Sequence, residues 1–271
     1  MLRIEKMATQ RVYSDFVNEC ELLRKMVHPH VLRFVGVCFE PPNLCIVTEF
    51  MPNGSLHDVL HGDSSRPGRP GPPPSRLSPA RALRYAEDIT SAMAYLHEQK
   101  VIHRDLKSAN LLLSAEDAVK VADFGVARNL SPKGEMTAET GTYRWMAPEV
   151  ILHQKYNEKV DVYSFGIILF ELFTSTVPYA HLSPLEAAAA VVREGLRPEV
   201  PPDVHPAVAA LASRCWSTLS ADRPSFAAIL DMMPALNAAL APTNPAQRQP
   251  SWRGGGLLGG LLGRRVSDGT R

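Results

Sequence analysis

His-Arg-Asp-Leu-Lys-Ser-Ala-Asn, at residues 103–110, is the stretch that decides the fold of this chain. It offers a carboxylate that could act as a base (Asp105), a cation two residues on (Lys107) and an amide oxygen that could bind a metal (Asn110). A second acidic motif, Asp-Phe-Gly, follows at residues 123–125. The spacing therefore predicts a polar site built from two separate loops.

The segment between the two motifs predicts how they are held. The apolar run at 111–113 and the alternating Val-Lys-Val at 119–121 flank a polar turn and predict a β-hairpin. Both acidic motifs would then lie on loops at strand ends, where rigid elements commonly position catalytic groups.

These motifs and the Ala-Pro-Glu at 147–149 occur in an order that resembles the eukaryotic protein kinases. The resemblance implies an α+β, bilobal protein-kinase-like fold, with an incomplete small β lobe and a complete, mainly helical large lobe. Residues 1–51 would form the partial small lobe and residues 52–240 the large catalytic lobe. A Pro-rich run at 62–76 would be a solvated insertion or, alternatively, a ligand for a proline-binding domain. The Pro-, Gly- and Arg-rich tail at 241–271 is predicted to be disordered.

The resemblance also implies ATP and Mg²⁺ as cofactors and assigns the site residues. Asp105 would orient the substrate hydroxyl and accept its proton, and Lys107 would lie beside the transferred γ-phosphoryl group. Asn110, a third catalytic residue, would bind the metal together with Asp123. The ATP-binding residues would be Thr48 (the gatekeeper), Glu49, Met51, Leu112 and Asp123.

A further set of residues would regulate or support this site. Arg104 implies switching by a phosphate on the activation loop, at Thr137 or Thr140, added by an upstream kinase or by autophosphorylation. The other regulatory residues would be Glu19 of the αC helix and Phe124. Asp161 would hold the catalytic loop, because a buried carboxylate is costly unless it is hydrogen bonded. Glu149 and Arg223 would form a structural pair.

Details of the motifs indicate the substrate. Lys107 and the Gly-Thr-Tyr-Arg run at 141–144 are similar to serine/threonine kinases, whereas Trp145-Met146 is also found in tyrosine kinases. This mixture, with the runs at 44–50 and 162–166, most resembles Raf-like members of the tyrosine-kinase-like group, including those of plants and algae. The implied activity is phosphorylation of protein serine or threonine in signal transduction.

Two parts of the kinase pattern are missing ahead of Glu19: the glycine-rich loop and the strand that ends in the ATP lysine. Lys6 has no strand pattern leading into it, so we interpret it as a solvated side chain and expect the true lysine to lie upstream of Met1. Two interpretations stay open. The chain is a fragment of an active kinase, which the retained catalytic groups favour, or a pseudokinase that acts as a binding or scaffold module. The upstream coding sequence would distinguish them.

Composition limits the other function classes. A net charge of +1 gives no electrostatic reason to expect nucleic acid as a partner. No apolar run reaches the ~20 residues that a membrane helix requires, and no signal peptide is apparent. The four cysteines are scattered, as expected for mostly buried, reduced thiols. Together these features predict a cytoplasmic, or alternatively nuclear, protein.

Local patterns predict the remaining elements. Apolar spacing and N-cap signals place helices at 12–26, 55–60, 78–98, 159–173, from 183, 206–216 and 224–236. Alternation and turn residues place strands at 31–38 and 44–50 in addition to the hairpin.

Overall fold

The computed structural model describes residues 17, 20–38, 45–62, 76–123 and 142–241. Residues 17 and 20–25 are helical and support the helix predicted at 12–26 over this part. Strands β1 (Phe34–Cys38) and β2 (Cys45–Thr48) form an antiparallel pair, and β3 (Leu111–Leu113) pairs antiparallel with β4 (Val119–Val121). The second pair is the predicted hairpin.

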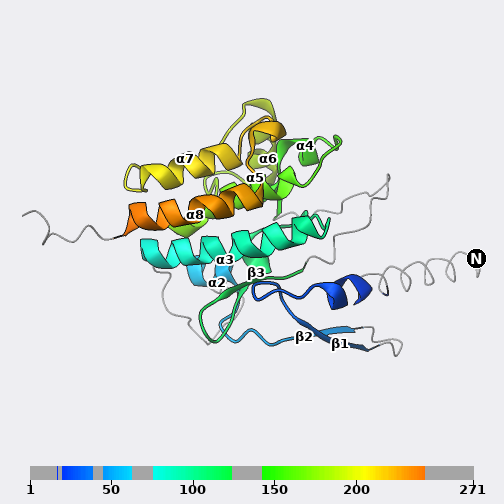
Figure 1. Cartoon of the computed structure of the whole chain (residues 1–271). Coiled ribbons are helices and arrows are strands. Elements are labelled where there is room, and N and C mark those ends of the chain that lie inside the picture. Colours follow the sequence, from blue (N-terminus) through cyan, green and yellow to red (C-terminus); the bar gives the residue numbers. More distant parts are fainter. Residues whose placement is uncertain (1–16, 18–19, 39–44, 63–75, 124–141, 242–271) are drawn as a thin grey trace, which may run out of the picture. The chain divides into compact units, whose positions relative to one another are not determined.

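Helices are the main regular elements among the described residues from 56 to 240 (Figure 1). The long helices α3 and α8 lie side by side, and α5 packs against both α3 and α7. The mixed helices and small sheets fit the predicted α+β, kinase-like fold. The helices are α2 (Leu56–His61), α3 (Pro79–Glu98), α4 (Pro148–Ile151), α5 (Lys159–Thr174), α6 (Pro184–Arg193), α7 (Pro206–Cys215) and α8 (Phe226–Leu240).

Helix α5 is buried almost along its whole length because most of its side chains are apolar. Gly166 allows α7 to approach closely, since a Cβ atom at this position would lie 2.9 Å from Cβ of Cys215. Cys215 itself is buried, and burial raises the pKa of its thiol to about 12. None of the four cysteines forms a disulfide, although Cys45 is exposed because alternate residues of β2 face outward.

Helix α3 begins where the sequence predicts. The Ser78 side chain accepts a hydrogen bond from the Arg81 N–H, and Pro79 occupies the first helical position, where no N–H is needed. Several element ends differ from the prediction by one to four residues, and α8 runs on to Leu240 instead of ending at 236. β1 starts at Phe34, because Val31 instead forms a parallel bridge with Val121, and β2 ends at Thr48. α8 starts at Phe226, because Ser225 is its N-cap.

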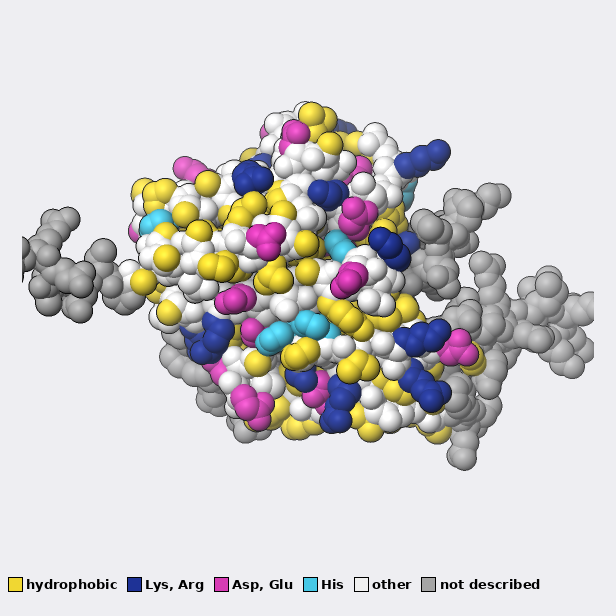
Figure 2. All heavy atoms as spheres, in the orientation of Figure 1, with side chains coloured by type: hydrophobic (Ala, Val, Ile, Leu, Met, Phe, Trp, Pro, Cys, Tyr) yellow, Lys and Arg dark blue, Asp and Glu magenta, His cyan; other side chains and the backbone are white. Residues whose placement is uncertain are grey.

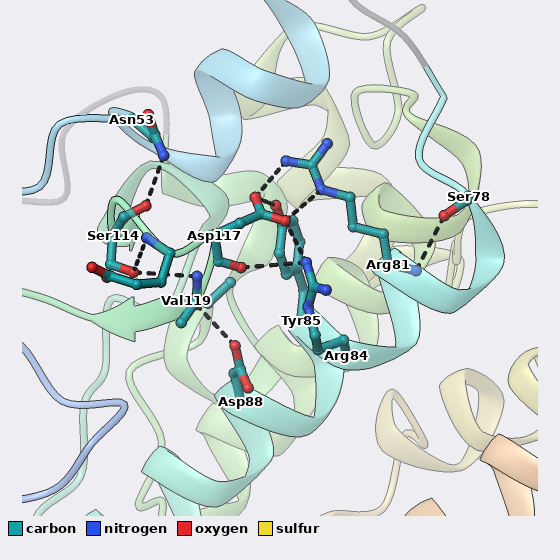
Figure 3. Close-up of polar contacts among 11 residues, drawn as sticks. Asn53, Ser78, Arg81, Arg84, Tyr85, Asp88, Ser114, Asp117 and Val119 are labelled. Carbon is teal, nitrogen blue, oxygen red and sulfur yellow. Dashed lines mark hydrogen bonds and ion pairs between the residues drawn. The ribbon is translucent and has the colours of Figure 1, made fainter.

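The β3–β4 turn is fastened to α3 by a polar cluster (Figure 3). Arg81, Arg84 and Tyr85 of α3 all bind the carboxylate of Asp117 in the turn. One helical turn further along, the Asp88 carboxylate accepts a hydrogen bond from the Val119 N–H at 2.9 Å. This cluster fixes the hairpin that leads from one predicted loop of the site to the other.

Basic and acidic side chains are interspersed on the face shown in Figure 2. Within the described segments, no helix is both long enough and apolar enough to cross a bilayer.

Candidate catalytic site

Asp161, in the first turn of α5, holds the loop at 103–110 through hydrogen bonds to its backbone. Its carboxylate accepts hydrogen bonds at 2.8 Å from the N–H groups of His103 and Arg104, and a third, also at 2.8 Å, from His97 Nε2. Asp161 is fully buried, so these donors offset the cost of removing its charge from water. Arg104 adopts a positive φ of 68°, which the two backbone hydrogen bonds hold in place.

His103 connects this loop to the end of β4. The Asp105 N–H donates to His103 Nδ1 at 3.3 Å, and His103 Nε2 lies 3.0 Å from the Ala122 carbonyl. Since Nδ1 accepts and a carbonyl can only accept, the ring carries its proton on Nε2. The buried imidazole therefore fixes Asp105 relative to Ala122, the residue before Asp123.

Asp105, Lys107 and Asn110 converge as the sequence predicts. Asn110 Nδ2 donates to the Asp105 carbonyl at 2.8 Å and to its Oδ2 at 3.0 Å. Lys107 Nζ lies 2.9 Å from the same Oδ2 and donates to Thr142 Oγ1, also at 2.9 Å. The second carboxylate oxygen, Oδ1, is buried and has no hydrogen-bond partner among the described residues. One oxygen of Asp105 is thus fixed and the other can accept a hydrogen bond.

Asn110 and Asp123 have the donor atoms that a hard cation requires. Because Asn110 Nδ2 donates both of its hydrogens to Asp105, its Oδ1 is left to bind a metal. The Ala122 N–H donates to the Asn110 carbonyl at 2.9 Å, which places the backbone before the exposed Asp123 beside Asn110. No cluster of three His, Cys, Asp or Glu side chains suited to a metal occurs in the described part of the chain. Mg²⁺ needs only one or two protein oxygens when water and phosphate complete its shell, so this pair fits it.

Several of the predicted ATP-binding residues lie around the end of β2 and on β3. The Thr48 hydroxyl donates to the Glu49 carbonyl at 3.3 Å. Met51 is buried, and Leu112 is half-buried and bridges to Ser55.

The Glu49 side chain forms an ion pair that sequence reasoning missed. Its carboxylate accepts hydrogen bonds from Lys120 Nζ at 2.7 and 2.9 Å and from the Arg33 N–H at 2.8 Å. Burial alone would raise the pKa of Glu49, but these hydrogen bonds and the nearby positive charges outweigh it and lower the pKa. The pair connects the residue after β2 to β4, and β4 ends two residues before Asp123.

The predicted structural pair is present. Arg223 is buried and donates to Glu149 Oε1 at 2.6 Å and to Oε2 at 3.0 Å. Its Nε also donates to the Ser217 carbonyl at 2.9 Å. This bidentate geometry fastens the segment after η3 (Thr142–Trp145) to the turn before α8.

The regulatory predictions are only partly covered by the structure. Arg104 places its guanidinium 5.7 Å from the centre of the Tyr156 ring, and its buried Nε has no partner in the described segments. Glu19, Phe124, Thr137 and Thr140 lie outside the described residues, as do most of the Pro-rich run and the tail.

Glu171 of α5 is a further buried carboxylate that sequence reasoning did not assign to the site. It accepts hydrogen bonds from the side chains of Ser108, Trp145 and His61. A second acidic residue, besides Asp161, in a largely apolar helix was the available signal, because such a charge must find partners inside the protein.

Comparison with known proteins places this geometry in context. The family described as "Protein tyrosine and serine/threonine kinase" matches residues 2–233. The chain is 44% identical to serine/threonine-protein kinase STY46 and 45% identical to serine/threonine-protein kinase STY17, both of Arabidopsis thaliana, over 95% and 93% of its length. It is 44% identical over 82% of its length to serine/threonine/tyrosine-protein kinase HT1 of the same plant. The chain spans only 44%, 42% and 55% of these relatives' own lengths.

Proposed function

Because the chain belongs to the protein tyrosine and serine/threonine kinase family, we propose that it transfers the γ-phosphoryl group of Mg-ATP to a serine or threonine hydroxyl of a protein. Lys107 supports this choice of acceptor, as do the names of the relatives, which are serine/threonine kinases, HT1 being named for tyrosine as well.

One observation carries the proposal: the two oxygens of Asp105 have different surroundings. Asn110 and Lys107 fix Oδ2, whereas Oδ1 is buried without a partner among the described side chains. An incoming hydroxyl would give Oδ1 the hydrogen bond that a buried carboxylate oxygen needs.

The roles of the residues follow from this arrangement. Asp105 would orient the acceptor hydroxyl and accept its proton as the new P–O bond forms. Lys107, held between Asp105 and Thr142, would supply positive charge beside the transferred group. Asn110 and Asp123 would hold Mg²⁺, which supplies neutralisation of the phosphate charge when it is bound. The fixed loop provides the alignment on which phosphoryl transfer mainly depends.

The remaining predicted residues complete the proposal. The segment from Thr48 to Met51, together with Leu112, would contact the nucleotide base between a small lobe at 1–51 and a large lobe at 52–240. A phosphate on Thr137 or Thr140, added by an upstream kinase or by the protein itself, would pair with Arg104.

The test uses the chain together with its upstream coding sequence, in which the ATP lysine is expected, with Mg-ATP and a serine/threonine peptide library as acceptor. Asp105→Asn should reduce the rate of transfer by about 10²-fold or more, the range expected when a general base is lost. Asp231→Asn, which alters an exposed carboxylate on α8, is the matched control and should leave the rate unchanged. A wild-type chain that binds Mg-ATP but transfers no phosphate would refute the proposal and indicate a binding module instead.

A further inference from the structure

Two cysteines face each other across the β1–β2 strand pair. In the register of this antiparallel pair, Cys38 at the end of β1 lies directly opposite Cys45 at the start of β2. Directly opposite residues of antiparallel strands have Cα atoms about 4.5–5.5 Å apart, and their side chains point to the same face of the sheet. Disulfides join residues whose Cα atoms lie about 4.4–6.8 Å apart. The two residues therefore stand within disulfide range, although both are free thiols in the structure.

The face that carries the two thiols is open to solvent. Cys45 is exposed and Cys38 is half-buried. Val47, two residues further along β2 on the same face, is 46% exposed. A small oxidant can therefore reach the Cys45 sulfur, and Cys38 stands opposite it as the thiol that reacts next.

The other two cysteines are in a different environment. Cys20 and Cys215 both lie in helices and are buried. Burial raises the pKa of the Cys215 thiol to about 12, and oxidants react with the thiolate rather than the thiol. Oxidation of this chain is therefore directed to the β1–β2 pair.

The strands that carry the exposed pair lead into the predicted nucleotide-binding residues. β2 ends at Thr48, three residues after Cys45, and the next residue, Glu49, donates its N–H to the Arg33 carbonyl at 3.0 Å. Among the described residues this sheet has two strands, and its register shifts once along the pair. A two-stranded sheet of this size is marginally stable, so a covalent bond between the strands would reduce its opening.

We propose that Cys38 and Cys45 form a redox-sensitive site, which hydrogen peroxide closes to a disulfide that fastens β1 to β2. A dithiol reductant reopens the site by thiol–disulfide exchange. Transient disulfides of this kind are the ones found in reducing compartments. The inference does not depend on the proposed kinase activity.

The reaction balances in two steps. The Cys45 thiolate first attacks one peroxide oxygen, the O–O bond breaks, hydroxide leaves, and Cys45 becomes a sulfenic acid. The Cys38 thiolate then attacks the Cys45 sulfur, the S–S bond forms, the S–O bond breaks, and a second hydroxide leaves. The two hydroxides take up the two thiol protons, so two thiols and one peroxide give one disulfide and two waters.

The test treats the whole chain with stoichiometric hydrogen peroxide in a buffer that contains a metal chelator. Peptide mass spectrometry without reductant identifies the crosslink, and non-reducing gel electrophoresis separates an internal disulfide from one between two chains. Cys45→Val combined with Val47→Cys is the matched control. It keeps an exposed thiol on the same face but places it opposite Gly36, about 7–8 Å diagonally from Cys38 and outside the disulfide range.

The wild type should form the internal disulfide between Cys38 and Cys45, and dithiothreitol should restore both thiols. Closure should be about tenfold or more slower in the control, because its thiol reaches Cys38 only when the strands shift. Closure of the wild type should slow amide hydrogen exchange in β1 and β2 about tenfold or more, since the crosslink removes entropy from the opened state.

Five results would overturn the inference. They are free thiols that persist at both positions, oxidation of Cys45 to the sulfinic acid without a crosslink, a disulfide between two chains, equally fast closure in the control, and hydrogen exchange that closure leaves unchanged.

Discussion

The positive φ of Arg104 provides a sharp test of how Asp161 acts. An L-residue in the left-handed region costs about 1–2 kcal/mol, whereas glycine adopts it freely. We attribute the 68° φ of Arg104 to the two hydrogen bonds that Asp161 accepts from the N–H groups of His103 and Arg104. If this is right, the cost of the left-handed conformation exists only while the Asp161 carboxylate is present.

Four proteins measure this coupling: Arg104→Gly and Arg104→Ala, each made with Asp161 and with Asp161→Asn. Both substitutions at 104 remove the Arg side chain, including its contact with Tyr156, so the difference between them reports the backbone alone. Glycine gains about 1–2 kcal/mol from relief of strain and loses about 0.4–1 kcal/mol to the greater entropy of the unfolded chain. With Asp161 present, the glycine variant should therefore be more stable than the alanine variant, by about 0.8 kcal/mol at the middle of these ranges.

The order should reverse in the Asp161→Asn background. Once the loop can relax, only the unfolded-state entropy remains, and glycine should be less stable than alanine by about 0.4–1 kcal/mol. Urea unfolding followed by circular dichroism gives the four free energies of unfolding, and their double difference gives the coupling. The same glycine–alanine difference in both backgrounds would refute the idea that Asp161 imposes the conformation of Arg104.

Two further predictions concern ion pairs away from the catalytic loop. Arg223→Met should lower the free energy of unfolding by about 3–5 kcal/mol, because it leaves Glu149 without its buried partner. Adding Glu149→Gln should restore part of this loss. A loss below about 1 kcal/mol, measured by urea unfolding, would contradict the prediction. For Asp117, burial alone would raise the pKa, but hydrogen bonds from Arg81 and Tyr85 lower it from the usual 3.8. A lowered pKa stabilises the fold above the unfolded value and loses that effect as the pH falls through the folded value. Asp117→Asn should therefore cost more stability at pH 7 than at a pH below the lowered pKa of the folded state, and an equal cost at both would count against the pairing.

Much of the secondary structure could be predicted because its signals are local. Ser78 and Pro79 mark the start of α3 within one helical turn, and the apolar run from Lys159 marks the buried α5. Local signals were weaker at element ends. Val31 belongs to an apolar strand pattern, yet it pairs with Val121, which lies far away in the sequence. Nothing near residue 31 could reveal that partner.

The residues of the candidate site also fall into those that a local motif indicates and those that it does not. The motif at 103–110 supplied Asp105, Lys107 and Asn110, and its likeness to kinases also indicated the partners of Asp161 and Arg223. Glu171 and the pair of Glu49 with Lys120 were not found, since their donors come from segments 26 to 110 residues away. No spacing rule predicts which of several buried groups such a side chain meets.

The sequence by itself determined the family, the order of the elements and the residue types that can move a phosphoryl group, because these depend on motifs and on periodicity along the chain. Only the tertiary structure decided which oxygen of Asp105 has no partner among the described residues, why Arg104 adopts a positive φ and how Glu171 joins the catalytic loop to η3. Each of these depends on packing between distant segments. There, a buried charge takes whatever donors the fold brings within about 3 Å of it.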